Sequence, residues 1–350
     1  MKDNKGRLSK SELILFSRQL SLALNSDISI TEGLNIIQSK SENPILVKAL
    51  EEIVAKVYTG YSFADAMEEQ EEVFSRFYVD MVKIGEESGN LAEILEQVSQ
   101  SYEREVVTVK KVKQAVTYPL ILTFLMFGVI VLLITEVMPM FDRVLKSLGG
   151  DMPQITKVIL QVGYFLKAYG WILLLVLALI ALGMYYYQKT EKGKRFFDRV
   201  KFMLPYQKEL TASILASRFA RNLGLLMSSG IPVNRALEMI YPIIDNQYLA
   251  ERIKDSIHEV NMGVGLDEVV DKLNLFPKLL IKLFSVGVAT GQMDKALLRA
   301  ADEMDSDVED KLTKLTTVLE PLLIIILSVI VGVILISVVL PVVSIMNNIG

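Results

Sequence analysis

The feature that most constrains this 350-residue chain is an internal repeat, in which a long block near the start returns near the end. One constant shift aligns the first half of the block, and after the loss of one residue a second shift aligns the rest. The matched pairs are Phe16 with Phe219, Arg18 with Arg221, Leu20 with Leu223, Ser26 with Ser229, Leu34 with Leu237, Gly60 with Gly263, Phe74 with Phe276, Gly85 with Gly287, Gly89 with Gly291, Pro119 with Pro321, Thr135 with Ser337 and Pro139 with Pro341. Because glycine tolerates positive φ and proline breaks or kinks a helix, a duplication that keeps these residues keeps its fold. The block is much longer than a solenoid repeat, so we predict two homologous domains.

Each copy runs into an apolar segment long enough to cross a membrane. Hydrophobic residues make up 51% of the chain and charged residues 22%, which indicates polar domains joined to concentrated apolar segments. Three segments carry no charge, at residues 114–135, 171–187 and 321–340. Each is long enough for a hydrocarbon core of about 30 Å. The sequence therefore predicts an integral membrane protein with three transmembrane helices.

Basic residues flank these segments unevenly, and this predicts the orientation. They are most frequent before the first and third segments and after the second, which by the positive-inside rule places both large domains in the cytoplasm. The predicted boundaries are cytoplasmic domain 1 at 1–115, transmembrane helix 1 at 116–137, a short extracytoplasmic loop at 138–168, transmembrane helix 2 at 169–188, cytoplasmic domain 2 at 189–318, transmembrane helix 3 at 319–341 and an extracytoplasmic tail at 342–350.

The soluble blocks have helical periodicity. Ser9 with Glu12 fits a capping box, and Leu13, Phe16 and Leu20 then share one helical face. Turn residues break each block into about six helices, and no segment shows sustained period-two alternation. The predicted fold class is all-α, with two homologous six-helix bundles on membrane stalks. Pro119 and Pro321 stand where each stalk enters the bilayer and are predicted to bend it there.

Two connecting segments also have amphipathic character. Phe141, Val144, Leu145 and Leu148 form an apolar stripe suited to the membrane surface, before a turn at Gly149, Gly150 and Pro153. Residues 188–208 form a basic linker suited to anionic lipid headgroups.

The segment from Gly85 to Gly89, with Glu86 and Glu87 inside it, is the motif closest to a ligand-binding loop. It lacks the lysine and hydroxyl of a phosphate loop, and two acids would repel an anion. The second copy keeps Gly287 and Gly291 and loses both acids. The glycines are therefore interpreted as structural, whereas Glu86 and Glu87 either face solvent or contact a basic partner.

No residue pattern predicts catalysis. His258 is the only histidine and is expected at or near the surface. The cluster of Asp302, Asp305, Asp307 and Asp310 lacks EF-hand spacing and is interpreted as a solvated helix face, with casual cation binding left open. The absence of cysteine excludes disulfides and thiolate metal sites, and a net charge of −4 argues against nucleic-acid binding. We expect no enzyme activity, no cofactor and no metal.

A membrane transporter or channel is the alternative function. Glu136 is the one acid at the outer edge of a span, and intramembrane ionisable groups mark transport pathways. The spans otherwise carry small and hydroxyl side chains that suit helix packing. An oligomer would be needed to build a pore.

Several motifs together resemble the type II secretion F / PilC family across nearly the whole chain. They are Phe16-x-Arg-x-Leu with its turn up to Leu34, the fuller copy from Phe219 to Leu237, Gly-Glu-Glu-Ser-Gly-Asn-Leu at 85–91, a proline at each stalk entry, and Leu-Gly-Gly-Asp-Met-Pro-Gln-Ile-Thr at 148–156. Asp27 and Ser29 depart from the glycine and proline that the family favours and that Gly230 and Pro232 keep, and residues 204–207 lack the usual glycine.

The resemblance implies an inner-membrane platform protein of a type IV pilus, type II secretion or competence pseudopilus machine. Its implied partners are a cytoplasmic assembly ATPase, pilin or pseudopilin subunits, other inner-membrane assembly proteins and further copies of itself, and no catalytic activity is implied. Pro119 and Pro321 are candidate hinges, and Thr135 and Ser337 are candidate contacts for pilin stems.

Overall fold

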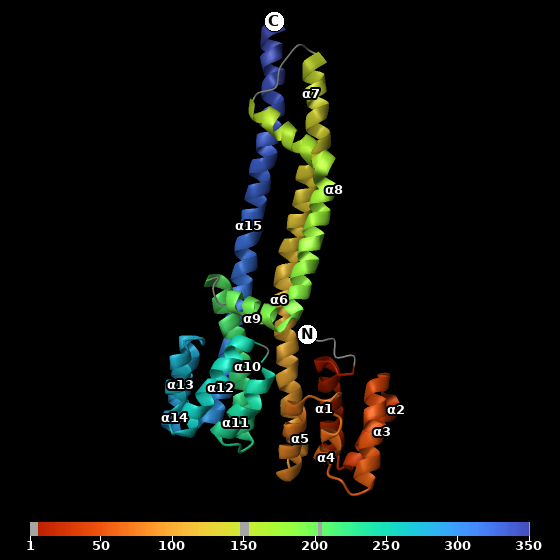
Figure 1. The fold of residues 1–350 in the computed structure, drawn as a ribbon, viewed down its shortest axis with the longest axis vertical. Helices are drawn as coiled ribbons and strands as arrows, with labels where there is room; N and C mark the ends of the chain where they lie inside the picture. The colour runs from red at the N-terminus through yellow and green to blue at the C-terminus, as the bar shows by residue number, and fades with distance from the viewer. Residues whose placement is uncertain (1–5, 148–153, 202–204, 245, 350) are drawn as a thin grey trace. The chain divides into compact units, whose positions relative to one another are not determined.

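The fold is described from a computed structural model, which describes residues 6–147, 154–201, 205–244 and 246–349. This part of the chain is helical and contains no strand, which confirms the all-α prediction (Figure 1). It divides into two compact units. The first comprises residues 1–110 and 188–309, and the second comprises residues 111–187 and 310–350.

The first unit contains both copies of the repeat as six-helix bundles. Bundle one consists of α1 (Lys10–Asn25), α2 (Ile30–Lys40), α3 (Pro44–Tyr58), α4 (Phe63–Glu68), α5 (Arg76–Glu87) and the beginning of α6 (Leu91–Leu132). Bundle two consists of α10 (Pro205–Ser228), α11 (Val233–Ile240), α12 (Gln247–Asn261), α13 (Leu266–Leu273), α14 (Lys278–Thr290) and the beginning of α15 (Met293–Ile349). A 3₁₀ turn, η2 (Tyr241–Ile243), follows α11, and α9 (Glu191–Lys201) precedes bundle two. Helix for helix, the two copies correspond as predicted.

The turns keep their backbone geometry between the copies. Gly60 and Gly263 have φ of 98° and 89°, in the left-handed region that favours glycine. At the first turn Gly230 has φ of 83°, and its counterpart Asp27 has φ of 60°. An aspartate at this position keeps the turn because short polar side chains tolerate the left-handed region. The departure from the family pattern therefore leaves the fold unchanged.

The two cores share an aromatic pair. The rings of Phe16 and Phe74 lie 5.7 Å apart in bundle one, and those of their counterparts Phe219 and Phe276 lie 5.1 Å apart in bundle two. All four side chains are buried. Such aromatic pairs stabilise the fold through dispersion and through the electrostatic interaction of the ring quadrupoles, in addition to the burial of apolar area. The first helix and the fourth loop of each bundle are therefore joined through equivalent core contacts.

The predicted capping box is confirmed at the start of α1. Ser9 Oγ accepts from Glu12 N at 3.3 Å, and Glu12 Oε2 accepts from Ser9 N at 2.7 Å. The hydrogen bonds with Ser9 hold the pKa of Glu12 below its ordinary value, against the opposing effect of burial. A carboxyl group whose pKa is lower in the folded chain than in the unfolded chain stabilises the fold at pH values above its unfolded pKa. This stabilisation is lost as the pH falls through its folded pKa.

Glu12→Gln is accordingly expected to destabilise bundle one by about 1 kcal/mol at pH 7. The difference from the parent chain should disappear as the pH falls through the lowered pKa of Glu12, because the parent carboxylate then becomes protonated as well. The chain contains no cysteine, so a single cysteine at buried Ala66 reports opening of bundle one through its rate of thiol labelling. Exposed Glu51→Gln is the control, and a difference that persisted at low pH would contradict the assignment.

The second unit contains the membrane-length helices. Among the described residues, three helical segments are long and apolar enough to cross a membrane, at Leu91–Val144, Thr156–Lys189 and Met293–Ile336, as predicted. The first contains a π-helical turn, η1 (Leu133–Val137), and the second lies in α8 (Gln154–Lys189). Both α6 and α15 continue as helix through Pro119 and Pro321.

The connection predicted as a loop at 138–168 is largely helical. Helix α7 covers Met138–Ser147, and α8 begins at Gln154, well before the predicted boundary of the second span. No glycine follows Met138 before residue 149, and an ion pair of Lys146 Nζ with Asp142 Oδ2 at 2.8 Å supports the helix. Residues 148–153, with Leu148, Gly149, Gly150 and Pro153, lie outside the described residues. The segment predicted as a C-terminal tail likewise continues α15 to Ile349.

Candidate functional site: a charged seam between the bundles

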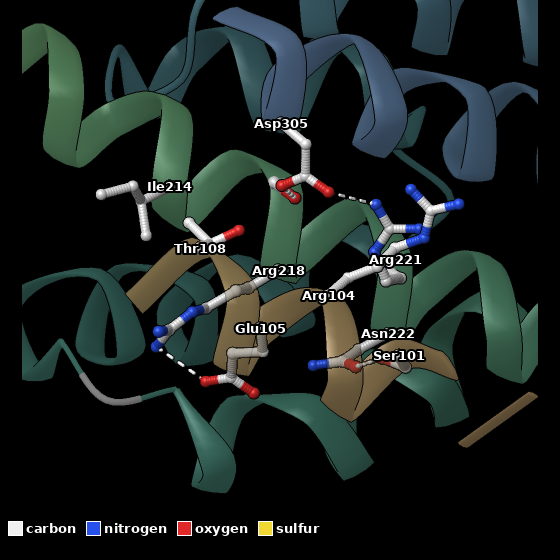
Figure 2. Close-up of a pocket in the computed structure, with 10 residues that line it drawn as sticks. Ser101, Arg104, Glu105, Thr108, Ile214, Arg218, Arg221, Asn222 and Asp305 are labelled. Carbon is white, nitrogen blue, oxygen red and sulfur yellow. Dashed lines mark hydrogen bonds and ion pairs between the residues drawn. The ribbon is translucent and has the colours of Figure 1, made fainter. Parts of the chain in front are cut away.

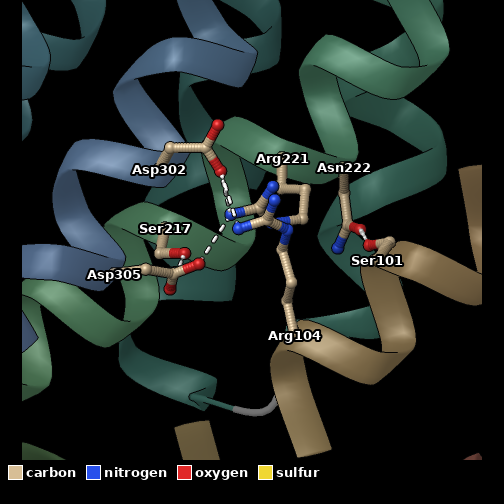
Figure 3. Close-up of polar contacts among 7 residues, drawn as sticks. All are labelled: Ser101, Arg104, Ser217, Arg221, Asn222, Asp302 and Asp305. Atoms are coloured by element: carbon tan, nitrogen blue, oxygen red, sulfur yellow. Dashed lines mark hydrogen bonds and ion pairs between the residues drawn. The ribbon is translucent and has the colours of Figure 1, made fainter. Parts of the chain in front are cut away.

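The two bundles of the first unit meet along a row of charged and polar side chains, here called the charged seam (Figures 2 and 3). Helix α6 of bundle one faces helices α10 and α15 of bundle two. The seam comprises Ser101, Arg104 and Glu105 on α6, Ser217, Arg218, Arg221 and Asn222 on α10, and Asp302 and Asp305 on α15. Sequence reasoning had matched only Arg18 with Arg221 and had named the aspartates without partners.

Asp302 joins the bundles at one end of the seam. Its Oδ1 atom lies 3.1 Å from Arg104 Nη1 of bundle one and 3.1 Å from Arg221 Nη2 of bundle two (Figure 3). The same Arg221 nitrogen lies 2.6 Å from Asp305 Oδ2, and Ser217 Oγ donates to Asp305 Oδ1 at 2.6 Å. Two carboxylates thus share one arginine, and one of them also reaches the neighbouring bundle.

Glu105 makes the second connection. Its Oε1 atom lies 3.0 Å from Arg218 Nη1 of α10 (Figure 2). Glu105 also pairs with Lys10 of α1. Its side chain is 16% exposed, and that of Arg218 is 25% exposed. Partial burial reduces the screening of this pair, so it is expected to contribute more than a solvent-exposed pair.

The cavity within the seam is too small for a substrate. Its volume is about 20 Å³, and charged and hydroxyl side chains line it (Figure 2). A space of this size accommodates about one water molecule. The seam is therefore a polar interface between two domains. Among the described residues no group of three or more His, Asp or Glu side chains could hold a metal ion.

One ion pair of the seam is itself repeated. Arg221 pairs with Asp305 in bundle two, and their counterparts Arg18 and Glu103 pair in bundle one. The two differ in burial, because Arg221 is 10% exposed and Arg18 is 41% exposed. Glu103 aligns with Asp305 under the same shift that aligns Gly85 with Gly287. The acid at both positions is a sequence signal that could have identified the partners of Arg18 and Arg221.

The aspartate cluster corrects one prediction. The prediction of a solvated helix face was wrong for Asp305 and Asp307, which are half-buried. Asp307 Oδ2 accepts a hydrogen bond from Ser213 Oγ at 2.6 Å. Asp302 and Asp310 are exposed, although Asp302 is part of the seam. The error has a tertiary cause, since the side chains that bind these acids belong to α10 and α6. His258 is exposed, as predicted.

The four motif glycines have two different structural roles. Gly89 and Gly291 end α5 and α14 with φ of 73° and 67°. Gly85 and Gly287 instead allow the next helix to come close, since a Cβ at Gly85 would lie 3.0 Å from Leu91 Cα and one at Gly287 would lie 2.8 Å from Ala296 Cβ. The structural interpretation of the glycines stands, with helix crossing added to helix capping.

Glu86 and Glu87 differ in their surroundings. Glu86 is half-buried, and its two carboxylate oxygens accept from Phe63 N and Ala64 N at 2.8 Å each, at the start of α4. A carboxylate at a helix N-terminus satisfies backbone donors and complements the helix dipole. Glu87 is exposed. The counterpart of Glu86 is Val288, and the corresponding helix α13 begins without a side-chain cap.

Glu86→Ala is expected to destabilise bundle one by about 2 kcal/mol, because two buried backbone donors lose a charged acceptor. Glu87→Ala changes an exposed neighbour and should cost less than about 0.5 kcal/mol. Thiol labelling of a cysteine at Ala66 compares the two. Equal effects would show that the carboxylate of Glu86 contributes nothing specific.

The remaining predicted residues lie in the second unit. Next to the two prolines, Tyr118 Oη donates to Glu320 Oε1 at 3.2 Å, and the two residues are themselves counterparts in the repeat. Thr135 lies in the π-helical turn and donates to Val131 O at 2.8 Å. The side chain of Ser337 lies outside the described residues. Glu136 pairs with Lys167 Nζ at 2.7 Å.

The duplicated six-helix bundles and three membrane-length helices define a class of multi-pass membrane proteins built on an internally repeated helical domain. The sequence profile described as type II secretion system (T2SS), protein F matches residues 16–139 and again residues 219–341. The chain belongs to this family.

Named relatives are similar over nearly the full length. The chain is 31% identical to the type IV pilus assembly protein PilC of Thermus thermophilus over 97% of its own length and 84% of that protein. It is 28% identical to the type II secretion system protein F of Aeromonas hydrophila, over 98% of this chain and 88% of that protein. It is 25% identical to PilC of Pseudomonas aeruginosa, over 97% of this chain and 91% of that protein.

Proposed function

We propose that this protein is the inner-membrane platform of a type IV pilus, type II secretion or competence pseudopilus machine. It would couple a cytoplasmic assembly ATPase to the extraction and polymerisation of pilin or pseudopilin subunits, without catalysing a reaction itself. Membership of the protein F family and the names of the relatives support this role.

The observation that carries the mechanical part is helix continuity. The last helix of each bundle is also the helix that holds a membrane-length segment, since α6 runs from Leu91 to Leu132 and α15 from Met293 to Ile349. A continuous helix can transmit displacement along its axis, and the hydrogen bond removed by Pro119 or Pro321 leaves each helix able to bend at the proline. A force on either bundle would therefore act on the membrane segment through an unbroken backbone.

The proposed orientation has both bundles and the N-terminus in the cytoplasm and the C-terminus outside. The basic residues that flank the spans support it. In this orientation the bundles are available to the ATPase, and exposed Glu87 is a candidate contact for it. Thr135 and Ser337 lie near the outer ends of two spans and remain candidate contacts for pilin stems.

Photo-crosslinking in the native cell tests the proposal. A photoreactive amino acid at Glu87 should capture an assembly ATPase, and one at Thr135 should capture a pilin or pseudopilin. The control position is exposed Leu177 within α8, which should capture neither. Mild-detergent purification followed by mass spectrometry identifies the products, together with other inner-membrane assembly proteins and further copies of the chain.

Capture of neither protein from either position, with the full chain intact, would contradict the platform role. Ion or solute flux through liposomes containing the purified protein alone would then support the transporter alternative. Glu136 and its partner Lys167 would be the first residues to substitute in that case.

A further inference from the structure

Helix α9 is tied to the membrane surface by the chain itself. Helix α8 ends at Lys189 and α9 begins at Glu191, so a single residue separates the membrane-length helix from α9. That residue, Thr190, caps α9, and its Oγ1 accepts from Gly193 N at 3.1 Å. At 1.5 Å per residue, Arg195 lies about 6 Å and Arg199 about 12 Å along α9 from its first residue. Measured along α9, Arg195 falls within the distance of about 8–10 Å over which surface charge is screened, and Arg199 falls slightly beyond it.

Contacts with α12 determine which face of α9 remains exposed. The buried carboxylate Asp198 Oδ2 accepts from Gln247 N at 3.2 Å at the start of α12. Arg195 Nη2 lies 2.8 Å from Glu251 Oε2 on the same helix. Phe196, the residue next to Arg195, is 57% exposed. An aromatic side chain exposed among basic residues is typical of a helix that inserts into the headgroup layer.

A cleft of about 450 Å³ lies between α9 and α12. Its lining comprises three arginines, two acids and two aromatic residues, namely Arg195, Arg199, Arg252, Glu251, Asp255, Phe196 and Tyr248. Glu251 is paired with Arg195, and Arg252 Nη2 donates to Tyr248 Oη at 3.0 Å while lying over the Tyr248 ring. Arg199 is exposed and forms no ion pair within the described part of the chain. The guanidinium groups of Arg199 and Arg252 are therefore accessible to an anion.

The charge of the segment matches an anionic surface. Residues 189–201 contain six basic and two acidic residues, whereas the whole chain carries a net charge of −4. Guanidinium binds phosphate oxygens in a bidentate manner, and basic residues near a membrane attract anionic lipids.

We infer that α9 and α12 form a binding site for the phosphate headgroup of an anionic phospholipid, with Arg199 and Arg252 holding the phosphate and Phe196 inserted beside the acyl chains. The inference rests on the membrane-spanning α8 and is independent of the proposed machine. Its consequence is that lipid binding fixes the entry of bundle two at the bilayer surface.

Fluorescence quenching tests the site in the full chain. Trp171 is the only tryptophan, so Trp171→Phe combined with Phe196→Trp provides a single indole at the site. The protein is placed in nanodiscs that contain phosphatidylcholine and phosphatidylglycerol, with bromine on the acyl chains of one lipid or the other at equal mole fraction. We expect stronger quenching when the bromine is on phosphatidylglycerol. Arg199→Gln with Arg252→Gln should lower this preference, by about fivefold for each arginine removed.

The control is Lys40→Gln with Lys48→Gln, which removes the same charge from exposed positions in bundle one and should leave the preference unchanged. Arg199→Lys with Arg252→Lys should retain most of the preference for phosphatidylglycerol. The side chains substituted in these variants are all exposed, so the fold should tolerate each change. Equal quenching by the two lipids, no quenching, or an undiminished preference in the glutamine variant would overturn the inference. Loss of the preference in excess inorganic phosphate, but not in sodium chloride of equal ionic strength, would also overturn it, because the site would then bind a soluble phosphate.

Discussion

Arg221→Met is expected to destabilise bundle two by about 3 kcal/mol, because it leaves two carboxylates, Asp302 and Asp305, without the cation between them. Arg221 is 10% exposed and Asp305 is 17% exposed, so water replaces the lost interaction only in part. The remaining acids also repel each other, and this adds to the cost. A cysteine at buried Ala236 reports the opening of bundle two by thiol labelling.

The repeat supplies the matched control for this substitution. Arg18→Met removes the counterpart arginine in bundle one, where the arginine is 41% exposed and its partner Glu103 is 47% exposed. An exposed pair is worth about 0–1 kcal/mol, so the labelling of a cysteine at Ala66 should change little. If both substitutions cost the same, burial would not explain the energetics of the seam. Asp302→Asn should in addition weaken the connection to Arg104 of bundle one.

Gly287→Val is expected to cost bundle two about 3 kcal/mol or prevent α14 from packing on α15. A Cβ at this position would lie 2.8 Å from Ala296 Cβ and 3.1 Å from Met293 Cα. The second neighbour is backbone, which cannot move without displacing the start of α15. Because α15 continues into a membrane-length segment, the same substitution is expected to impair assembly by the machine if the platform role is correct.

Two further variants test the cause. Ala289→Val introduces the same side chain at an exposed position of α14 and should cost no more than about 0.7 kcal/mol. Adding Ala296→Gly to Gly287→Val removes the nearest clashing atom and should restore part of the lost stability. The free energy of unfolding is measured by thiol labelling of a cysteine at Ala236. If Ala289→Val and Gly287→Val lowered it equally, the crossing of α14 and α15 would not be tight.

Much of the fold was predictable because its signals are local. The helical face of Leu13, Phe16 and Leu20, the capping residue Ser9 and the glycines at the turns each act within one helix or its ends. Within the segment at 138–168 the apolar stripe was visible in the sequence, but the extent of α7 was not, because its one helix breaker, Pro139, stands in the first turn, where proline is tolerated. The glycines were correctly interpreted as structural, but the close helix crossing at Gly85 and Gly287 depends on a neighbouring helix.

The sequence by itself determined the duplication, the helical class and the three membrane segments, because repetition, periodicity and an uninterrupted apolar stretch can all be recognised along one chain. Only the tertiary structure decided which charges meet. Arg104, Arg221 and Asp302 come from three helices that are distant in the sequence, and nothing in their local pattern identifies the partners. The physical reason is that a hydrophobic pattern specifies which face of a helix is buried, whereas the identity of the helix that covers that face depends on the packing of the whole domain.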